Sequence, residues 1–172
     1  MEILYDILKI LLPSLVVFFT AYYSIKLLTK NDKEKKAIES RSDSQKEITM
    51  LRLQAYERIT LFLERISLSS LITRVSNNKL SPEEFHLLLL TEIRREFEHN
   101  ITQQLYISHE AWKTVVDTKE TIVKIINLSK VKLPKNSNLV DFTKAIIEND
   151  LVNETPTMRA IEFIKKEARE LF

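Results

Sequence analysis

The chain has 172 residues, and 26 basic residues are nearly balanced by 24 acidic ones, which leaves a formal net charge of +2. This balance argues against nucleic-acid binding, which depends on a surplus of lysine and arginine, so we expect no nucleic-acid partner. The chain has no glycine, although phosphate-binding loops, dinucleotide fingerprints and nucleophile elbows all need it. It also has no cysteine, which removes one nucleophile and fits a reducing compartment. The composition therefore argues strongly against nucleotide-dependent chemistry and less strongly against enzymes in general, and we expect no cofactor.

The most apolar part of the chain is an uncharged run at residues 10–25. At about 1.5 Å per helical residue, this run and its apolar neighbours reach the roughly 30 Å of a hydrocarbon core. A cleaved signal peptide fits less well, because acidic residues precede the run and no small-residue cleavage site follows it. A buried core helix is the third interpretation. We predict that residues 1–28 form a transmembrane anchor in contact with membrane lipid. The predicted span contains Ile10, Pro13, Phe18, Phe19, Tyr22 and Tyr23.

The charges beside this run predict its orientation. Only Lys9 precedes it, whereas six basic residues follow it between positions 26 and 41. Positive charge stays on the cytoplasmic side of a membrane. We therefore expect a single-pass protein with its N-terminus outside and its C-terminal domain in the cytoplasm.

Residues 29–49 are charged and of mixed sign. Such a segment is either a helical stalk that continues the preceding helix or a flexible linker, and the sequence favours neither.

Helical periodicity dominates residues 50–172. Apolar residues recur at three- and four-residue spacing over residues 50–76 and 82–106, which predicts two amphipathic helices. The buried face of the second is expected to include Ile101 and Leu105. Further helices are expected after residue 108, around residues 139–146 and after residue 156. Short connections between them favour a compact all-α bundle of about five helices.

The predicted helices have recognisable ends. Ser81, followed by Pro82 and by Glu84 at the third helical position, predicts a capping box. Ser108 is the expected N-cap of the third helix, and Pro134 should close that helix.

Charged residues on the first two of these helices form a candidate interhelix network. If the helices are antiparallel neighbours, opposite charges face each other and fix the register, although exposed pairs add only about 0–1 kcal/mol each. The main candidates are Arg58, Glu64, Arg65, Arg94, Arg95 and Glu98, and the same two helices also carry Arg52, Glu57, Glu92 and Glu96.

A candidate partner-binding surface lies between residues 100 and 112. Side-chain amides beside aromatic rings are typical of binding surfaces. The candidates are Asn100, Gln103, Gln104, Tyr106 and Trp112. Trp112 also falls on an apolar stripe, which favours a core position for its ring.

Two acid–histidine pairs suggest a metal site as an alternative. Glu83 with His86, and Glu96 with His99, have the spacing that di-iron bundles use. On one helix the pairs lie about 20 Å apart, too far for a shared two-metal site. A single site that includes Glu92 stays open. The simpler interpretation is a solvated helix face with intrahelical pairs, and we predict no bound metal.

Two stretches resemble a known family. Residues 51–66 (LRLQAYERITLFLERI) and 98–108 (EHNITQQLYIS), the latter followed by Ala111-Trp112, are similar to an uncharacterised family of small, N-terminally membrane-anchored helical proteins of Bacteroidota. The likeness covers residues 1–125. It implies a bacterial inner-membrane protein and no particular activity.

These observations together predict a membrane-anchored helical accessory or scaffold subunit. It would bind an unidentified protein partner or larger membrane complex at the cytoplasmic face of the inner membrane, without catalysis. Two alternatives remain: a helical metal-dependent enzyme or metal sensor, and a homo-oligomeric structural membrane protein.

Overall fold

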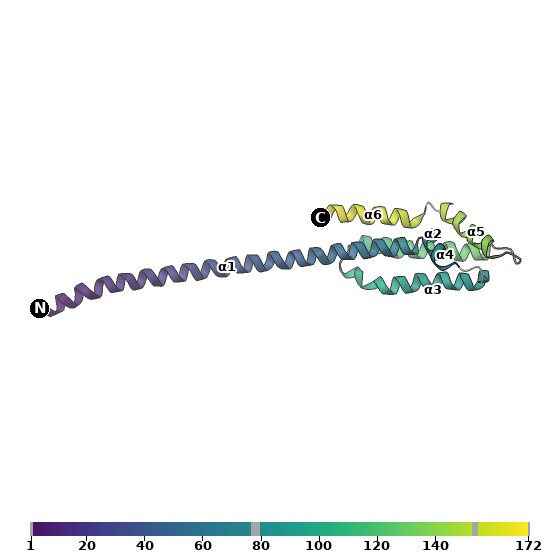
Figure 1. Cartoon of the computed structure of the whole chain (residues 1–172). Coiled ribbons are helices and arrows are strands. Elements are labelled where there is room, and N and C mark those ends of the chain that lie inside the picture. Colours follow the sequence, from purple (N-terminus) through teal and green to yellow (C-terminus); the bar gives the residue numbers. More distant parts are fainter. Residues whose placement is uncertain (1, 77–79, 153–154, 172) are drawn as a thin grey trace. The chain divides into compact units, whose positions relative to one another are not determined.

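The computed structural model describes the backbone of residues 2–76, 80–152 and 155–171, and the side chains of residues 15–26, 41, 43–76, 80–152 and 155–171. These residues form helices and no strand, so the all-α prediction is confirmed. The elements are α1 (Glu2–Ile66), α2 (Leu68–Val75), α3 (Pro82–Asn100), the 3-10 helix η1 (Ile101–Leu105), α4 (His109–Val131), α5 (Leu139–Val152) and α6 (Pro156–Leu171) (Figure 1). The described residues thus contain seven helices, and the expected number of five is wrong.

The chain divides into two compact units, residues 1–49 and residues 50–172. The division falls inside α1, whose helical backbone includes residues 29–49. The finer division of the first unit into an anchor at 1–28 and a stalk or linker at 29–49 stays a prediction.

The apolar run of the first unit does not meet the requirements of a membrane span over the described residues. Phe18, Phe19, Tyr22 and Tyr23 are exposed, and the side chains of Ile10 and Pro13 lie outside the described residues.

Within the described part of the chain, no helix combines the length and the apolar character needed to cross a membrane. This finding corrects the predicted single-pass location in a bacterial inner membrane, with its N-terminus outside and its C-terminal domain cytoplasmic. The predicted contact of the N-terminal helix with membrane lipid stays a prediction.

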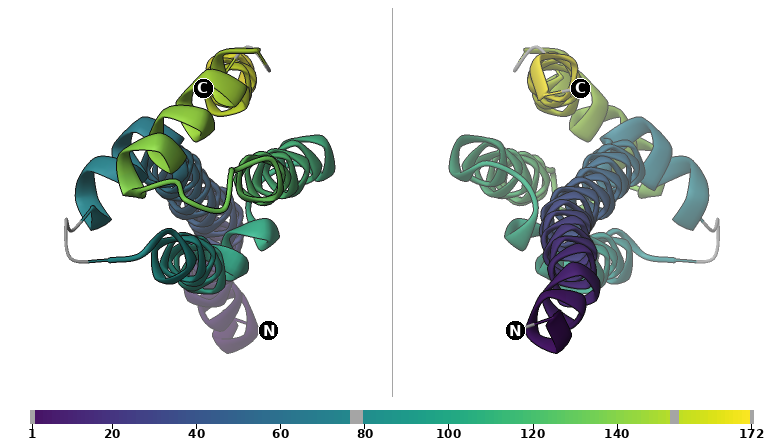
Figure 2. Two further views of the ribbon diagram at one scale, coloured as in Figure 1. Left: turned by 90° about the vertical axis from the view of Figure 1, so that its right-hand side faces the viewer. Right: turned by 90° about the vertical axis from the view of Figure 1, so that its left-hand side faces the viewer.

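The second unit is a bundle whose chain direction alternates. Its part of α1 is antiparallel to α3, α4 runs back beside α3, and α6 returns along α4 (Figure 1). The end-on views show α3, α4 and α6 around residues 50–66 of α1 (Figure 2). The short helices α2 and α5 pack on each other at one end. Short connections between successive helices account for the antiparallel order.

Apolar side chains from α1 through α6 fill the core of this unit. Phe85 of α3 and Phe142 of α5 meet edge to face, with ring centroids 6.3 Å apart. Each buried large side chain contributes roughly 1.5–3 kcal/mol relative to exposure. The largest fully buried side chains are Ile59, Phe62, Leu63, Ile66, Leu68, Leu71, Phe85, Leu89, Ile93, Ile122, Ile126 and Phe142.

The helix expected over residues 50–76 is interrupted at Ser67. This residue has an extended backbone (φ −54°, ψ 134°), and its hydroxyl donates to the carbonyl oxygen of Glu64 at 2.8 Å. The change of direction buries Leu68 and Leu71 of α2. No proline or glycine marks this break in the sequence. The break depends instead on the packing of α2 against the other helices, which is a tertiary interaction.

The helix expected over residues 82–106 also ends early, at Asn100. The chain continues as the 3-10 helix η1, which has no buried residue. A 3-10 helix has about three residues per turn instead of 3.6, so the apolar stripe rotates away from the core. Consequently Ile101 is 41% and Leu105 is 77% exposed, and their predicted burial is wrong.

The predicted N-caps are confirmed. The Ser81 hydroxyl accepts from the backbone N–H of Glu84 at 3.2 Å, and the Glu84 carboxylate accepts from the Ser81 N–H at 2.8 Å. The Ser108 hydroxyl accepts from the N–H of Ala111 at 2.9 Å and begins α4.

Replacing Ser81 by alanine should lower the free energy of unfolding by about 1 kcal/mol, because α3 then loses the acceptor for a terminal N–H. Urea denaturation of the full chain measures this change. The matched control is Ser70→Ala on α2, an exposed serine that should change the free energy by less than about 0.5 kcal/mol. Equal effects of the two substitutions would contradict the capping role.

Candidate protein-interaction site

Two glutamates of α3 lie on its inward face. Glu92 and Glu96 follow Phe85 and Leu89 along the same side of the helix, and they are only 7% and 8% exposed. A buried carboxylate is costly unless it is paired and hydrogen-bonded. The interpretation of this part of α3 as a solvated face is therefore wrong for these two residues.

Three arginines neutralise the two carboxylates. Arg65 of α1 contacts Glu96 Oε1 through Nη2 at 2.6 Å and through Nε at 2.8 Å. Arg74 of α2 places Nη1 at 3.3 Å from Glu92 Oε2 and at 3.4 Å from Glu96 Oε1. Arg95 Nη2 reaches Glu92 Oε2 at 2.6 Å. We call these five residues the arginine–glutamate cluster; it joins α1, α2 and α3.

The cluster overlaps only partly with the predicted interhelix network. Arg65 and Arg95 belong to both. Glu64, Arg94 and Glu98 are exposed and form no ion pair among the described residues.

The prediction missed Arg74 as a member of the network. Glu92 and Glu96 are among the charged residues expected there, and their position on the apolar stripe of the helix indicates that each needs a cation. Arg74 gives no such signal in the sequence, because it reaches the two glutamates only where the break at Ser67 changes the direction of the chain.

An open groove lies beside the cluster, between α1 and α3. It has a volume of about 620 Å³. Its lining residues are Arg58, Leu61, Phe62 and Arg65 of α1, and Arg95, Glu96, His99 and Asn100 of α3. We call it the α1–α3 groove. Its rim is basic, and its wall is partly apolar.

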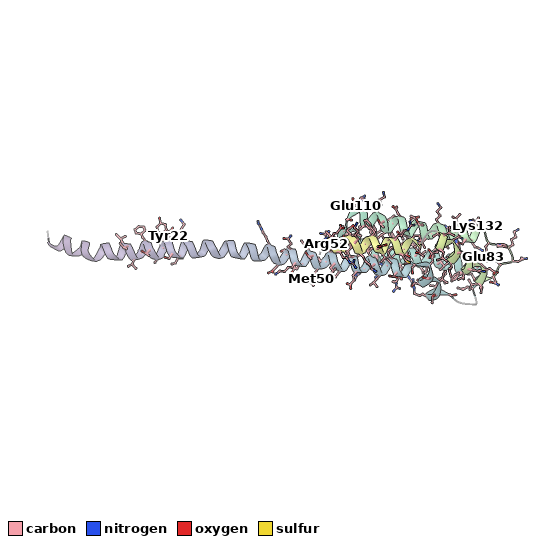
Figure 3. The ribbon with its side chains drawn as sticks, turned by 90° about the horizontal axis from the view of Figure 1, so that it is seen from above. Tyr22, Met50, Arg52, Glu83, Glu110 and Lys132 are labelled. Atoms are coloured by element: carbon pink, nitrogen blue, oxygen red, sulfur yellow. The ribbon has the colours of Figure 1, made fainter. Side chains whose placement is uncertain are left out.

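The turn that follows the groove is exposed but firmly held. Asn100 is buried and donates through Nδ2 to the carbonyl oxygen of Glu96 at 2.8 Å. At the other end of η1, Arg52 Nε donates to the carbonyl oxygen of Tyr106 at 3.2 Å. Arg52 and Glu110 lie at this end of the bundle, and Glu83 and Lys132 lie at the opposite end (Figure 3).

The predicted partner-binding residues fall into two groups. Gln103, Gln104 and Tyr106 lie at the surface of the turn, where the Gln103 amide donates to the Thr102 hydroxyl at 3.3 Å. Asn100 is buried, as described above. The Trp112 ring is partly buried against the core and stacks on the ring of Phe97, with centroids 5.5 Å apart.

Four exposed residues of the turn and the half-buried Gln103 define a surface that the prediction only partly contained. We call it the η1 surface; its residues are Ile101, Gln103, Gln104, Leu105 and Tyr106.

A hydrogen-bonded triad links this end of α4 to α1 and α6. The Tyr56 hydroxyl donates to Glu167 Oε1, and the Ser108 hydroxyl donates to Glu167 Oε2 at 2.8 Å. Burial, followed by the hydrogen bond to the Glu167 carboxylate, raises the pKa of Tyr56 from 10.0 to about 12. The triad holds the start of α4, and therefore one end of the turn, against the rest of the bundle.

The acids of both acid–histidine pairs are engaged by cations. Glu83 forms an ion pair with Lys130, and Glu96 contacts two arginines. His86 Nε2 lies 2.8 Å from Asn127 Oδ1. Among the described residues, no three carboxylate, histidine or cysteine side chains come together as a metal-binding group.

The second unit is thus an all-α bundle with a charge-lined groove and an exposed 3-10 turn. The chain belongs to a family of unknown function (DUF7935), whose sequence model matches residues 2–171. The resemblance to an uncharacterised family is confirmed to that extent, and the match extends well beyond residue 125. Comparison with curated proteins and with solved structures found no match to this chain.

Replacing Arg74 by alanine should destabilise the chain by about 1–3 kcal/mol, because Glu92 and Glu96 then lie close together with one cation fewer. This magnitude lies between the cost of breaking an exposed ion pair and the cost of breaking a fully buried one. Arg94→Ala removes the same charge from an exposed position of α3 and should cost less than about 0.5 kcal/mol. Urea denaturation of both full-length variants makes the comparison. Equal unfolding free energies would show that the cluster does not stabilise the bundle.

Tyr56 should ionise later than an ordinary tyrosine. Because its pKa is raised in the folded chain, its contribution to stability is complete below pH 10 and is lost as the pH rises from 10.0 to about 12. The ultraviolet absorbance of tyrosinate should therefore show one of the five tyrosines titrating late. In Tyr56→Phe the late phase should disappear, and the stability should fall less over this pH range. A wild-type titration with all five tyrosines near pH 10 would contradict the triad.

Proposed function

We propose that this chain is a non-catalytic helical scaffold or accessory subunit that binds a protein partner through the η1 surface. The observation that supports this proposal best is the exposure of two large aliphatic side chains, Leu105 and Ile101, on a turn held at both ends. Binding residues are commonly found on loops that a rigid scaffold positions. Exposed apolar side chains beside adaptable amides match the composition of many interfaces.

The structure suggests how such a surface would bind. Leu105 and Ile101 would supply the apolar contact, since burial of apolar area contributes roughly 25 cal/mol per Å². The amides of Gln103 and Gln104 donate and accept hydrogen bonds and would orient the partner. Because Asn100 and Arg52 already fix the ends of the turn, little conformational entropy is lost when the partner binds.

Photo-crosslinking in cells tests this proposal. A photoreactive phenylalanine analogue at position 105 should give a defined adduct with one other protein, identified by mass spectrometry. The matched control is the same analogue at Val131, another strongly exposed aliphatic residue, at the end of α4 away from the turn. Val131 should give no such adduct.

Three other results of this experiment would contradict the proposal. The same adducts at both positions would mean that the η1 surface is not selective. An adduct with a second copy of this chain alone would favour a homo-oligomeric structural protein. No adduct at either position would leave the η1 surface without a protein partner.

A further inference from the structure

We infer that the α1–α3 groove binds an acidic helical segment of the protein partner. The segment would carry two carboxylates about two helical turns apart, with an apolar side chain between them. This inference rests on the proposed function, because it names the chemistry of the partner that the chain binds.

The groove has a surplus of positive charge. The three arginines of the arginine–glutamate cluster face only two carboxylates, which leaves one positive charge uncompensated. Arg58 adds a second and, among the described residues, has no hydrogen bond or ion pair. The formal charge of the whole chain is only +2, so this excess is a local feature rather than a property of the whole surface.

The arginines still have donors to offer. A guanidinium carries five N–H groups, and Arg95 uses only Nη2 to reach Glu92. The side chains of Arg65 and Arg95 remain 52% and 68% exposed while they hold the glutamates. Guanidinium groups bind carboxylates through two parallel hydrogen bonds, which favours Asp or Glu as the bound group.

The spacing of the groove residues matches a helical ligand. Arg58 and Arg65 lie seven residues apart on one face of α1, about 10 Å along the helix axis. Between them, Leu61 is exposed beside the groove and Phe62 closes its base. A helix with acids at positions i and i+7 and an apolar residue at i+3 or i+4 places the complementary groups at the same intervals. Amphipathic helices commonly bind in grooves of this kind.

The carboxylates in the groove argue against a polyanion with closely spaced phosphates. Glu96 lines the groove, and Glu92 lies directly behind its rim. Both would repel a continuous row of negative charge, whereas a helical peptide brings only two carboxylates, and one of them meets Arg58, which has no carboxylate partner among the described residues. Charge complementarity therefore favours an acidic peptide over nucleic acid.

Selection from a display library of random helical peptides tests this inference. Peptides of about fourteen residues, roughly four helical turns, are selected against the full-length chain. We expect enriched peptides to carry two acids seven residues apart with an aliphatic or aromatic residue between them. Their affinity should fall steeply with added salt, because exposed charge pairs are screened.

Two matched variants locate the binding site. Arg58→Gln removes a groove charge without breaking a described ion pair, so the fold should be unchanged, and we expect it to weaken an enriched peptide about tenfold. Arg94→Gln removes the same charge from an exposed position of α3 outside the groove and should leave the affinity unchanged. Circular dichroism checks that both variants fold, and fluorescence anisotropy measures binding.

The inference is overturned by any of three results: no enrichment, enriched peptides without paired acids, or equal effects of Arg58→Gln and Arg94→Gln. Failure of the proposed function gives a different result, namely the absence of a partner adduct at position 105. A partner that crosslinks at position 105 and binds Arg58→Gln as well as wild type would overturn only the role of the groove.

Discussion

The pairing of Glu92 and Glu96 with three arginines is the interaction on which the rest of the site depends. Two carboxylates buried on one turn of α3 are tolerable only if cations reach them from neighbouring helices. Arg65 comes from α1 and Arg74 from α2, so the requirement fixes how these helices stand relative to α3. A bundle held by apolar contacts alone would tolerate small shifts in register, whereas these charge pairs tolerate few.

The same pairing shapes both surfaces that we connect with binding. The Glu96 carboxylate accepts a hydrogen bond from Arg65, and the Glu96 backbone carbonyl accepts one from Asn100. One residue therefore orients both the rim of the α1–α3 groove and the start of the η1 turn. The Tyr56–Glu167–Ser108 triad holds the far end of the turn. The exposed turn and the basic groove are therefore adjacent, because Asn100 lines the groove and directly precedes η1. A partner that contacts both would have an apolar patch next to an acidic helix.

Local sequence signals predict the start of a helix well where a capping residue marks it. The Ser81 capping box and the Ser108 N-cap depend on hydrogen bonds within one turn, so the residues alone specify them. The break at Ser67 and the change to a 3-10 helix at Ile101 have no such signal. Both changes depend on how α2 and the η1 turn pack against the other helices of the bundle. For that reason helical periodicity predicts Ile101 and Leu105 in the core, whereas both are exposed.

The order of the residues alone specifies a helical chain, the starts of α3 and α4, and a glycine-free backbone without the standard phosphate-binding loops. These properties follow from periodicity, capping and composition, which act over a few residues. The packing of the helices, in contrast, brings Arg74 together with Arg65 and Arg95 around the glutamates. It also leaves the groove with more positive than negative charge. The distance between charged groups on different helices depends on how the helices pack, and no short stretch of sequence encodes that distance.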